Sequence, residues 1–279
     1  MRTFRRCVLG AALLGPLLLV PATGASAAPT WAPASIAPVH PGVQTITPSG
    51  QCTSNFVFFD ADAVYLGQAA HCSSTGGQTD TNGCVAGSLP VGTEVSVGGA
   101  SHPGVMVYNS WLTMQAQGEA DADTCKYNDL ALVKLDPADA ANVNPSIPHW
   151  GGPNGLNSAG TSLLQRVYSY GNSSLRLGLT QLSPKIGISN GDDGGGWTHS
   201  VSTLTPGVPG DSGSAFLDKS GKALGVLSTL NVAVPGGVTN GVGDLRRELD
   251  YLHAHTSFSG VQLALGTVAF NGNRLPLGI

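Results

Sequence analysis

The chain has 279 residues, of which 41% are hydrophobic, 11% are charged and 39 are glycine, and its formal net charge is −4. Disordered chains combine high charge with low hydrophobicity, so this composition predicts a compact, loop-rich fold. Because the sequence has a mildly acidic balance and no arginine- or lysine-rich patch, it argues against nucleic acid and anionic membranes as partners.

The first 27 residues have the pattern of a secretory signal peptide. Three arginines precede an apolar run from Val8 to Val20, and Ala25, Ser26 and Ala27 follow as a small-residue cleavage site. That run is too short to span a bilayer, and no later stretch is apolar enough to do so. We therefore expect a secreted chain with no membrane contact after signal removal, and residues 28–41 as an N-terminal arm or short pro-segment.

Strand patterns follow in the first half of the chain. Short apolar or alternating runs are separated by turn residues, and Asp60-Ala61-Asp62 reads as a hairpin turn between two of them. The expected strands are 54–59, 63–66, 93–97, 104–108 and 130–135. A segment rich in proline and glycine, 145–155, reads as a linker.

The second half resumes the same pattern and ends differently. The expected strands are 163–170, 176–182, 197–204, 214–217 and 223–230. Asp244 is a good N-cap, and Leu245, Leu249 and Leu252 follow at helical spacing, which predicts a helix ending near His255. Beyond it, 261–270 reads as one more strand. Repeated short strands of this kind predict an all-β barrel or sandwich.

Four cysteines remain after the signal: Cys52, Cys72, Cys84 and Cys125. An even number in an oxidising compartment predicts two disulfides, and four cysteines allow three pairings. No Cys-x-x-Cys occurs, which argues against a zinc site. Asp192 to Gly196 lacks the carboxylate spacing of a calcium loop, so we expect a flexible solvent loop there. No metal and no cofactor are expected.

Three short motifs carry the chemistry. In Pro209-Gly210-Asp211-Ser212-Gly213-Ser214 the glycines leave the Ser212 hydroxyl uncrowded, and the N–H groups of Gly210 and Ser212 are able to point the same way. A serine hydroxyl needs a base, and the base needs an orienting group. His71 ends the run Ala69-Ala70-His71-Cys72, and Asp129 opens the apolar run Asp129 to Leu135.

In this order, the three motifs resemble those of the trypsin-like (chymotrypsin-fold) serine proteases of the secreted bacterial type, over roughly Gln51 to His255. The resemblance implies Ser212 as nucleophile, His71 as general base and acid, Asp129 as its orienting residue, and Gly210 and Ser212 as oxyanion donors. It also implies a bridge between Cys52 and Cys72, which leaves Cys84 and Cys125 for the second.

The fold implied is all-β, with two six-stranded antiparallel β-barrels and a C-terminal helix. The first barrel would span 42–147 and the second 148–279, together with the helix and a tail that the resemblance does not place. The substrate would be a polypeptide bound in the cleft between the barrels. The sequence does not indicate an oligomeric state.

The resemblance also suggests a specificity pocket. It puts Pro206, which offers no charge, at the pocket floor, Ser228 at the pocket serine and Leu230 where many relatives have glycine. Leu227 stands where relatives with an acidic preference have a histidine, and Val208 where a pocket-bridging cysteine often lies. An apolar, shallow pocket predicts small or medium apolar residues, such as Ala, Val or Leu, before the scissile bond.

Asp211 needs a partner if it is buried. No Ile-Val-Gly-Gly sequence is present to supply a new N-terminal amine, so activation by that route is not expected. Arg166 is the nearest candidate partner and Arg176 the runner-up. The alternative function is a catalytically silent binding protein on the same fold.

Overall fold

A computed structural model describes residues 29–76, 81–233 and 237–276 of the chain. The predicted signal peptide at 1–27 lies outside these described residues. Within them, no helix is long and apolar enough to cross a membrane.

The described residues form short strands throughout. Their bounds are β1 Gln44–Thr47, β2 Gly50–Thr53, β3 Val57–Phe59, β4 Val64–Ala69, β5 Glu94–Val97, β6 Gly104–Asn109, β7 Leu130–Lys134, β8 Arg166–Tyr170, β9 Pro184–Asp193, β10 Thr198–Leu204, β11 Ala215–Leu217, β12 Ala223–Ala233, β13 Gly237–Asp244 and β14 Gln262–Leu263.

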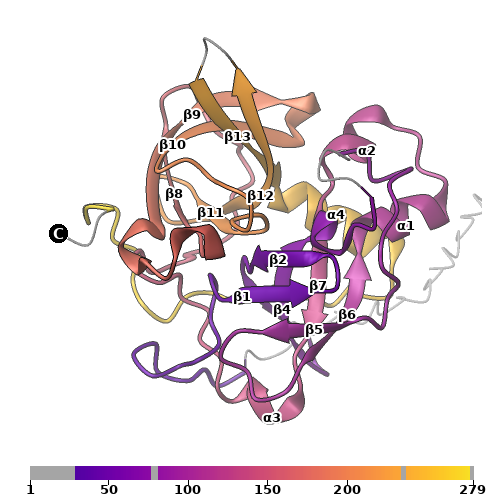
Figure 1. Cartoon of the computed structure of the whole chain (residues 1–279), viewed down its shortest axis with the longest axis horizontal. Helices are drawn as coiled ribbons and strands as arrows, with labels where there is room; N and C mark the ends of the chain where they lie inside the picture. The colour runs from indigo at the N-terminus through magenta and orange to yellow at the C-terminus, as the bar shows by residue number, and fades with distance from the viewer. Residues whose placement is uncertain (1–28, 77–80, 234–236, 277–279) are drawn as a thin grey trace, which may run out of the picture.

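The strands make two antiparallel sheets (Figure 1). The second closes into a six-stranded barrel in the order β10-β13-β12-β11-β8-β9, as expected. The first is a curled eight-stranded sheet, in the order β14-β3-β4-β7-β6-β5-β1-β2, and among the described residues hydrogen bonds do not close it. The expected all-β, two-barrel architecture is therefore confirmed, although the first unit is an open half-barrel with β2 at one edge.

The tail supplies the other edge strand. Only Gln262–Leu263 is extended and paired, with Gln262 opposite Phe59 of β3 and Leu263 opposite Phe58. The chain thus returns from the second barrel to the first sheet, which the sequence did not indicate.

The helices are short except at the C-terminal end. They are α1 Ser110–Gln117, α2 Ala122–Tyr127, α3 Pro137–Ala140 and α4 Leu245–His255, with 3-10 turns η1 Ala70–Ser73, η2 Ser174–Arg176, η3 Thr180–Leu182 and η4 Gly194–Gly196. The predicted C-terminal helix is α4, and the Asp244 side chain caps it by accepting from the N–H of Arg247.

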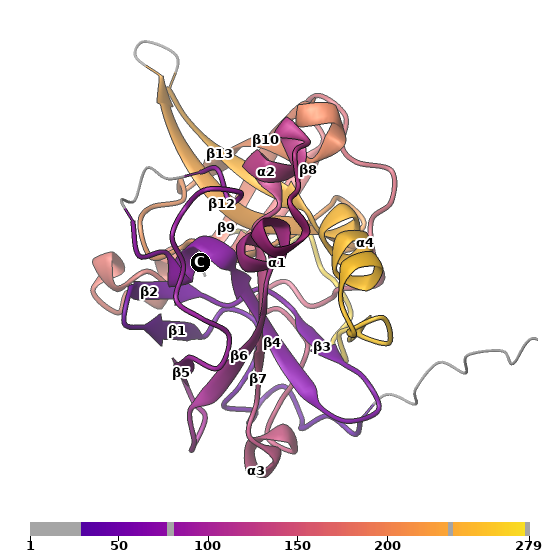
Figure 2. The ribbon, with the colours of Figure 1, turned by 90° about the vertical axis from the view of Figure 1, so that its right-hand side faces the viewer.

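Helix α4 joins the two sheets (Figures 1 and 2). Its buried leucines pack in one apolar cluster with Phe56 and Phe58 of the first sheet and with Leu217 and Val226 of the barrel. Each unit also has apolar residues of its own, around Val133 in the first sheet and around Phe216 inside the barrel. Burial of this shared cluster fixes the position of one sheet against the other.

Both predicted disulfides are confirmed. Cys52 is bonded to Cys72 and Cys84 to Cys125, across sequence separations of 20 and 41 residues. The first joins the edge strand β2 to the turn η1, and the second joins the 81–87 segment to α2.

The strand predicted at 176–182 is wrong. The segment contains η2 and η3 instead, and between them Leu177 and Gly178 have φ angles of 52° and 77°. A strand cannot continue through residues with positive φ. The leucines here are exposed and not buried as in a barrel strand: Leu177 by 87% and Leu179 by 54%, and Leu175 just before them by 64%.

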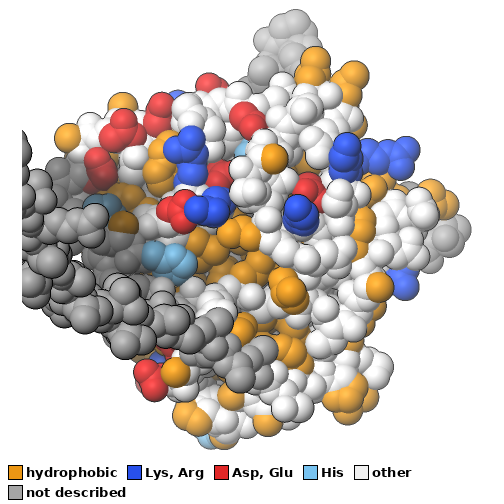
Figure 3. All heavy atoms as spheres, turned by 180° about the vertical axis from the view of Figure 1, so that it is seen from behind, with side chains coloured by type: hydrophobic (Ala, Val, Ile, Leu, Met, Phe, Trp, Pro, Cys, Tyr) orange, Lys and Arg blue, Asp and Glu red, His pale blue; other side chains and the backbone are white. Residues whose placement is uncertain are grey.

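Seen from behind, the surface carries acidic and basic side chains interspersed with exposed apolar ones (Figure 3). Neither sign of charge forms a continuous area on the face shown.

The segment 192–196, expected as a solvent loop, is the end of β9 followed by η4, and Asp192, Asp193 and Gly195 in it are exposed. The Asp192 side chain also contacts a buried histidine. Asp192 lies in β9, and its Oδ1 is 2.7 Å from Nδ1 of His199. Nε2 of His199 lies 3.0 Å from Oδ2 of Asp244. The His199 side chain is fully buried. Burial alone lowers the pKa of His199, but the hydrogen bonds to the two carboxylates outweigh it, so the pKa is raised above its usual value. Through a carboxylate at each ring nitrogen, His199 links β9, β10 and the start of α4.

We predict that His199→Gln destabilises the protein most at low pH. A raised pKa in the folded state gives stability that is fully present below the pKa of the unfolded chain and is lost as pH rises through the folded pKa. Urea unfolding of both proteins at about pH 5.5 and about pH 9 should give a loss of about 3 kcal/mol at the lower pH and a smaller loss at the higher. A loss that stays constant or grows with pH would contradict the paired imidazolium.

Candidate active site

His71 and Asp129 come together because their strands are neighbours. His71 lies in η1 directly after β4, Asp129 directly precedes β7, and Ala69 pairs with Leu130 across the two strands. The His71 Nδ1 atom is 2.7 Å from Asp129 Oδ2, and the His71 backbone N–H donates to Asp129 Oδ1 at 2.9 Å. The carboxylate therefore fixes both the ring and the backbone of the histidine.

Two more groups hold Asp129 in place. The Ser228 hydroxyl donates to Asp129 Oδ2 at 2.5 Å, so the predicted pocket serine contacts the predicted triad acid. From α4, Glu248 Oε1 accepts the backbone N–H of Asp129 at 3.0 Å. Asp129 is 3% exposed, and these contacts leave its charge directed at His71.

Glu248 is a fully buried carboxyl group that makes no ion pair within the described residues. Burial raises the pKa of Glu248 well above its usual range, and the carboxylates of Asp129 and Asp244 act in the same direction. We therefore treat Glu248 as neutral, which avoids a second buried negative charge beside Asp129.

The imidazole of His71 is suited to accept a proton. Burial disfavours its charged form, but the charge of Asp129 and the hydrogen bond to it raise the pKa of His71 above its usual value. Its side chain is 24% exposed, so the outer nitrogen remains reachable from the cleft.

Ser212 and His71 line one cavity between the two sheets. The cavity has a volume of about 690 Å³, and Asp129, Gly210 and Leu230 also contribute to its walls. No hydrogen bond joins the Ser212 hydroxyl to His71 within the described residues. Such contacts often tighten only when substrate binds.

The backbone beside Ser212 offers two unused donors. Among the described residues, neither the N–H of Gly210 nor that of Ser212 donates a hydrogen bond, although the N–H groups of Asp211, Gly213 and Ser214 all do. Both residues line the cavity. Two unbonded N–H groups beside a hydroxyl are the arrangement that binds a developing oxyanion.

The loop 209–213 rests on the first sheet. The carbonyl of Ser212 accepts from the N–H of Thr53 in β2 at 2.8 Å. Gly213 has a φ of 86°, and a Cβ there would lie 2.6 Å from the carbonyl oxygen of Thr53 and 2.9 Å from the nitrogen of Ala69. Only glycine permits this contact, which sets the distance between Ser212 and the strand that leads to His71.

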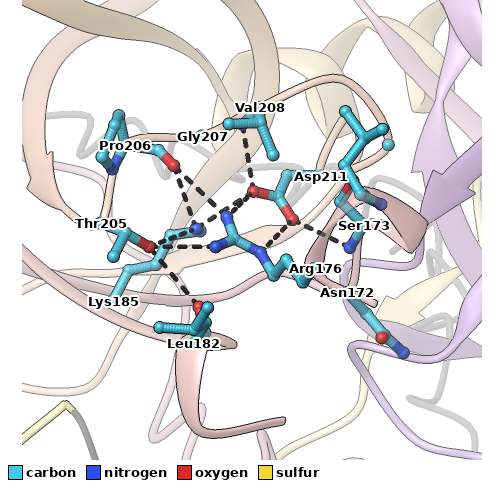
Figure 4. A network of polar contacts seen from close by, with 12 residues as sticks. Asn172, Ser173, Arg176, Leu182, Lys185, Thr205, Pro206, Gly207, Val208 and Asp211 are labelled. Carbon is cyan, nitrogen blue, oxygen red and sulfur yellow. Dashed lines mark hydrogen bonds and ion pairs between the residues drawn. The ribbon is translucent and has the colours of Figure 1, made fainter. Parts of the chain in front are cut away.

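Asp211 belongs to this loop, and its side chain is fully buried beneath the loop, where it has two cationic partners (Figure 4). Arg176 of η2 reaches Asp211 Oδ2 at 2.5 Å, and Lys185 of β9 reaches the same oxygen at 3.1 Å. Arg166, the first candidate, is therefore the wrong partner, and the runner-up Arg176 is correct. Arg166 is exposed and lines a separate hollow beside Tyr168 and Phe270.

Lys185 was not predicted from the sequence. Its side chain is fully buried and contacts Thr205 Oγ1 and the carbonyl of Pro206 at 3.3 Å each. Burial and the neighbouring Arg176 lower the pKa of Lys185 to about 8, against the opposing effect of Asp211. The Asp211 carboxylate is thus paired with two cations: Arg176, and Lys185, which loses its proton more readily because its pKa is lowered.

The predicted specificity residues separate into two groups. Ser228 and Leu230 line the cavity. Pro206 is not among its described lining residues, and its carbonyl faces backwards to Arg176 and Lys185, at 3.3 Å each. Any role of Pro206 as the pocket floor would thus act through the neighbouring Gly207 and Val208, which line the cavity.

Asn240 also narrows the pocket. It pairs with Leu230 across β12 and β13, is 2% exposed, and lines the cavity. Its side chain accepts from the N–H of Gly207 at 3.0 Å and donates to the carbonyl of Thr229 at 3.3 Å, which ties the two walls together. No motif marks this residue, since its effect depends on the β12–β13 register.

A metal centre finds little support in the described residues. The one group of candidate ligands is Cys52, His71 and Cys72, whose ligand atoms lie within 4.8 Å of one another. The two sulfurs are bonded to each other, so they cannot bind a metal as thiolates.

We predict that Arg176→Met destabilises the protein far more than Arg166→Met. The first change leaves a buried carboxylate with only Lys185, and breaking a buried pair in this way costs about 3–5 kcal/mol. Arg166 serves as the matched control because it is exposed and does not contact Asp211. Urea unfolding of the two variants measures the difference, and equal losses would contradict the structural role given to Arg176.

Neither a scan against protein-family models nor a search of curated proteins found a match. Among solved structures the chain is similar to Thermobifida fusca Protease A, with 17% identity and a TM-score of 0.52 over 82% of this chain and 99% of that one. It is also similar to Nocardiopsis protease, with 18% identity and a TM-score of 0.49 over 81% of this chain and 98% of that one. The likeness to Protease A shows that this chain has the two-barrel chymotrypsin fold of bacterial serine proteases.

Proposed function

We propose that the chain is a secreted serine endopeptidase that cleaves peptide bonds through an acyl-enzyme on Ser212. The observation that carries this proposal is the convergence on one cavity of Ser212, the His71–Asp129 pair and the unbonded N–H groups of Gly210 and Ser212. A shared fold alone does not establish an activity. The two disulfides support an oxidising compartment.

In the proposed reaction, Ser212 Oγ attacks the substrate carbonyl carbon while His71 Nε2 takes its proton. The carbonyl oxygen becomes an oxyanion, which the N–H groups of Gly210 and Ser212 stabilise. The imidazolium, stabilised by Asp129, then gives its proton to the departing amine as the C–N bond breaks. Water repeats these steps on the ester, which releases the acid and restores Ser212.

We expect Ser212→Ala and His71→Ala each to reduce peptide turnover by ~10⁴-fold or more, because the two residues act as one unit. The double variant should be little worse than either single variant. In the unaltered protein, turnover should fall as pH drops through the raised pKa of His71, since the imidazolium cannot act as a base. Correctly folded protein that cleaves no peptide in a diverse library would favour the binding-protein alternative, and a flat pH profile would exclude His71 as base.

The geometry of the pocket supports a preference for small or medium apolar residues, such as Ala, Val or Leu, before the scissile bond. Leu230, at 42% exposure, and Asn240 both line the cavity, and the Asn240 side chain is hydrogen-bonded to the N–H of Gly207. Leu227, where an acid-specific relative would need a polar group, is apolar. A pocket shortened in this way excludes large aromatic rings on steric grounds.

Leu230→Gly should broaden this preference toward Phe and Tyr. We expect the kcat/KM of a Phe substrate relative to its Ala counterpart to rise by ~10-fold or more, since each methylene accommodated contributes ~1–3 kcal/mol. A library profile of the unaltered protein dominated by Lys, Arg or Glu would overturn the proposed pocket.

A further inference from the structure

Side chains outside the triad fix both peptide units around Gly210. On one side, the Ser173 hydroxyl donates to the carbonyl of Pro209 at 2.5 Å. Ser173 is 2% exposed, so this hydrogen bond is shielded from water. Ser173 lies at the start of η2, and its backbone N–H also donates to Asp211 Oδ1 at 3.1 Å (Figure 4).

On the other side, the first sheet holds the carbonyl of Gly210. The Thr53 hydroxyl donates to it at 2.8 Å and the Gln51 amide at 2.9 Å. Both residues belong to the edge strand β2. Gln51 in turn accepts the N–H of Ser174 at 3.0 Å, which ties β2 to η2 as well.

The Ser173 contact determines where the Gly210 N–H points, and the contacts of Thr53 and Gln51 fix the next peptide unit, so that Gly210 is held from both sides. The peptide bonds on both sides of Gly210 are trans, and in a trans peptide the N–H is directed opposite to the carbonyl of the same unit. Anchoring the Pro209 carbonyl on Ser173 therefore turns the Gly210 N–H away from Ser173. If that peptide rotated, a carbonyl oxygen would replace the donor and repel an oxyanion.

Gly210 itself is required by the same contacts. It has a φ of 90°, and a Cβ would lie 2.6 Å from Gln51 Oε1 and 2.9 Å from Ser173 Oγ. A side chain here would displace the Gln51 amide and the Ser173 hydroxyl, and the positive φ favours glycine.

We propose that Ser173 and Thr53 are positioning residues that keep the Gly210 N–H directed at the oxyanion, with Gln51 assisting from the cleft wall. The inference rests on the proposed function, since it concerns the donor of the same site. These contacts come from both units. Thr53 lies in β2 of the first sheet, Ser173 directly precedes η2 in the second unit, and Gly210 lies between them. The contacts hold the donor in place without a contribution from a newly cleaved N-terminus.

The test compares four variants. Ser173→Ala and Thr53→Val remove the donating hydroxyls, whereas Ser173→Thr and Thr53→Ser retain them and serve as matched controls. Kinetics on a peptide that the unaltered protein cleaves give kcat and KM separately. A peptide aldehyde provides a second measure, because Ser212 adds to its carbonyl and forms an oxyanion without turnover.

We expect Ser173→Ala and Thr53→Val each to lower kcat by ~10–100-fold, part of the ~10²–10³-fold that loss of a whole oxyanion donor costs. KM should change by less than ~3-fold, because the donor acts in the transition state, and aldehyde affinity should weaken with kcat. The two hydroxyl-retaining variants should stay within ~3-fold of the unaltered protein in kcat.

A purely structural role would give another result. If folded Ser173→Ala and Thr53→Val keep their kcat and aldehyde affinity while only their melting temperatures fall, the inference is overturned. The same holds if Ser173→Thr and Thr53→Ser lose as much activity as the variants without a hydroxyl. If the unaltered protein cleaves nothing, the proposed function fails and the inference with it, so the two failures are distinguishable.

Discussion

The buried carboxylate of Asp211 is the constraint on which the candidate site depends. It lies beneath the loop that carries Ser212, where an unpaired charge would cost several kcal/mol. Arg176 and Lys185 neutralise it, and the backbone N–H groups of Ser173 and Val208 also donate to its oxygens. Because these partners come from η2, β9 and the loop itself, the ion pair draws three parts of the second unit around one turn.

The contact between the two sheets then sets the distance between nucleophile and base. The loop rests on β2 and β4, the Cys52–Cys72 disulfide joins β2 to the turn that carries His71, and α4 covers both sheets. Helix α4 also supplies Glu248, whose buried carboxyl group has a raised pKa and accepts the backbone N–H of Asp129. The candidate site therefore lies where the two units meet, and residues of each unit orient site residues of the other.

The sequence predicted those parts of the site that short motifs encode. Ser212, His71 and Asp129 were found from three runs of residues, and the fold class and both disulfides followed from them through the family resemblance. The sequence did not predict the roles of four other residues, because these roles arise from single contacts between residues distant in the chain. They are Asn240, Ser173, Thr53 and Glu248. Arg176 was ranked below Arg166, since the sequence does not reveal that Arg166 is exposed on β8 whereas η2 carries Arg176 inward.

The errors in secondary structure have a related cause. The segment 176–182 was predicted to be a strand, yet Leu177 and Gly178 have positive φ, and Leu177 and Leu179 face solvent. Conversely, β9 and β13 are rich in glycine and polar residues, but neighbours in the closed barrel pair with them on both sides. In these segments tertiary pairing outweighs local propensity.

The central claim is that Ser212 is an activated nucleophile in the folded chain. A peptidyl phosphonate ester with a small apolar residue next to phosphorus reacts covalently with such a serine, and the adduct is measured by intact mass and located by peptide mapping. The account predicts one adduct, on Ser212, that does not form in urea-unfolded protein or in His71→Ala. Folded protein that forms no adduct, or forms it on another residue, would contradict the account.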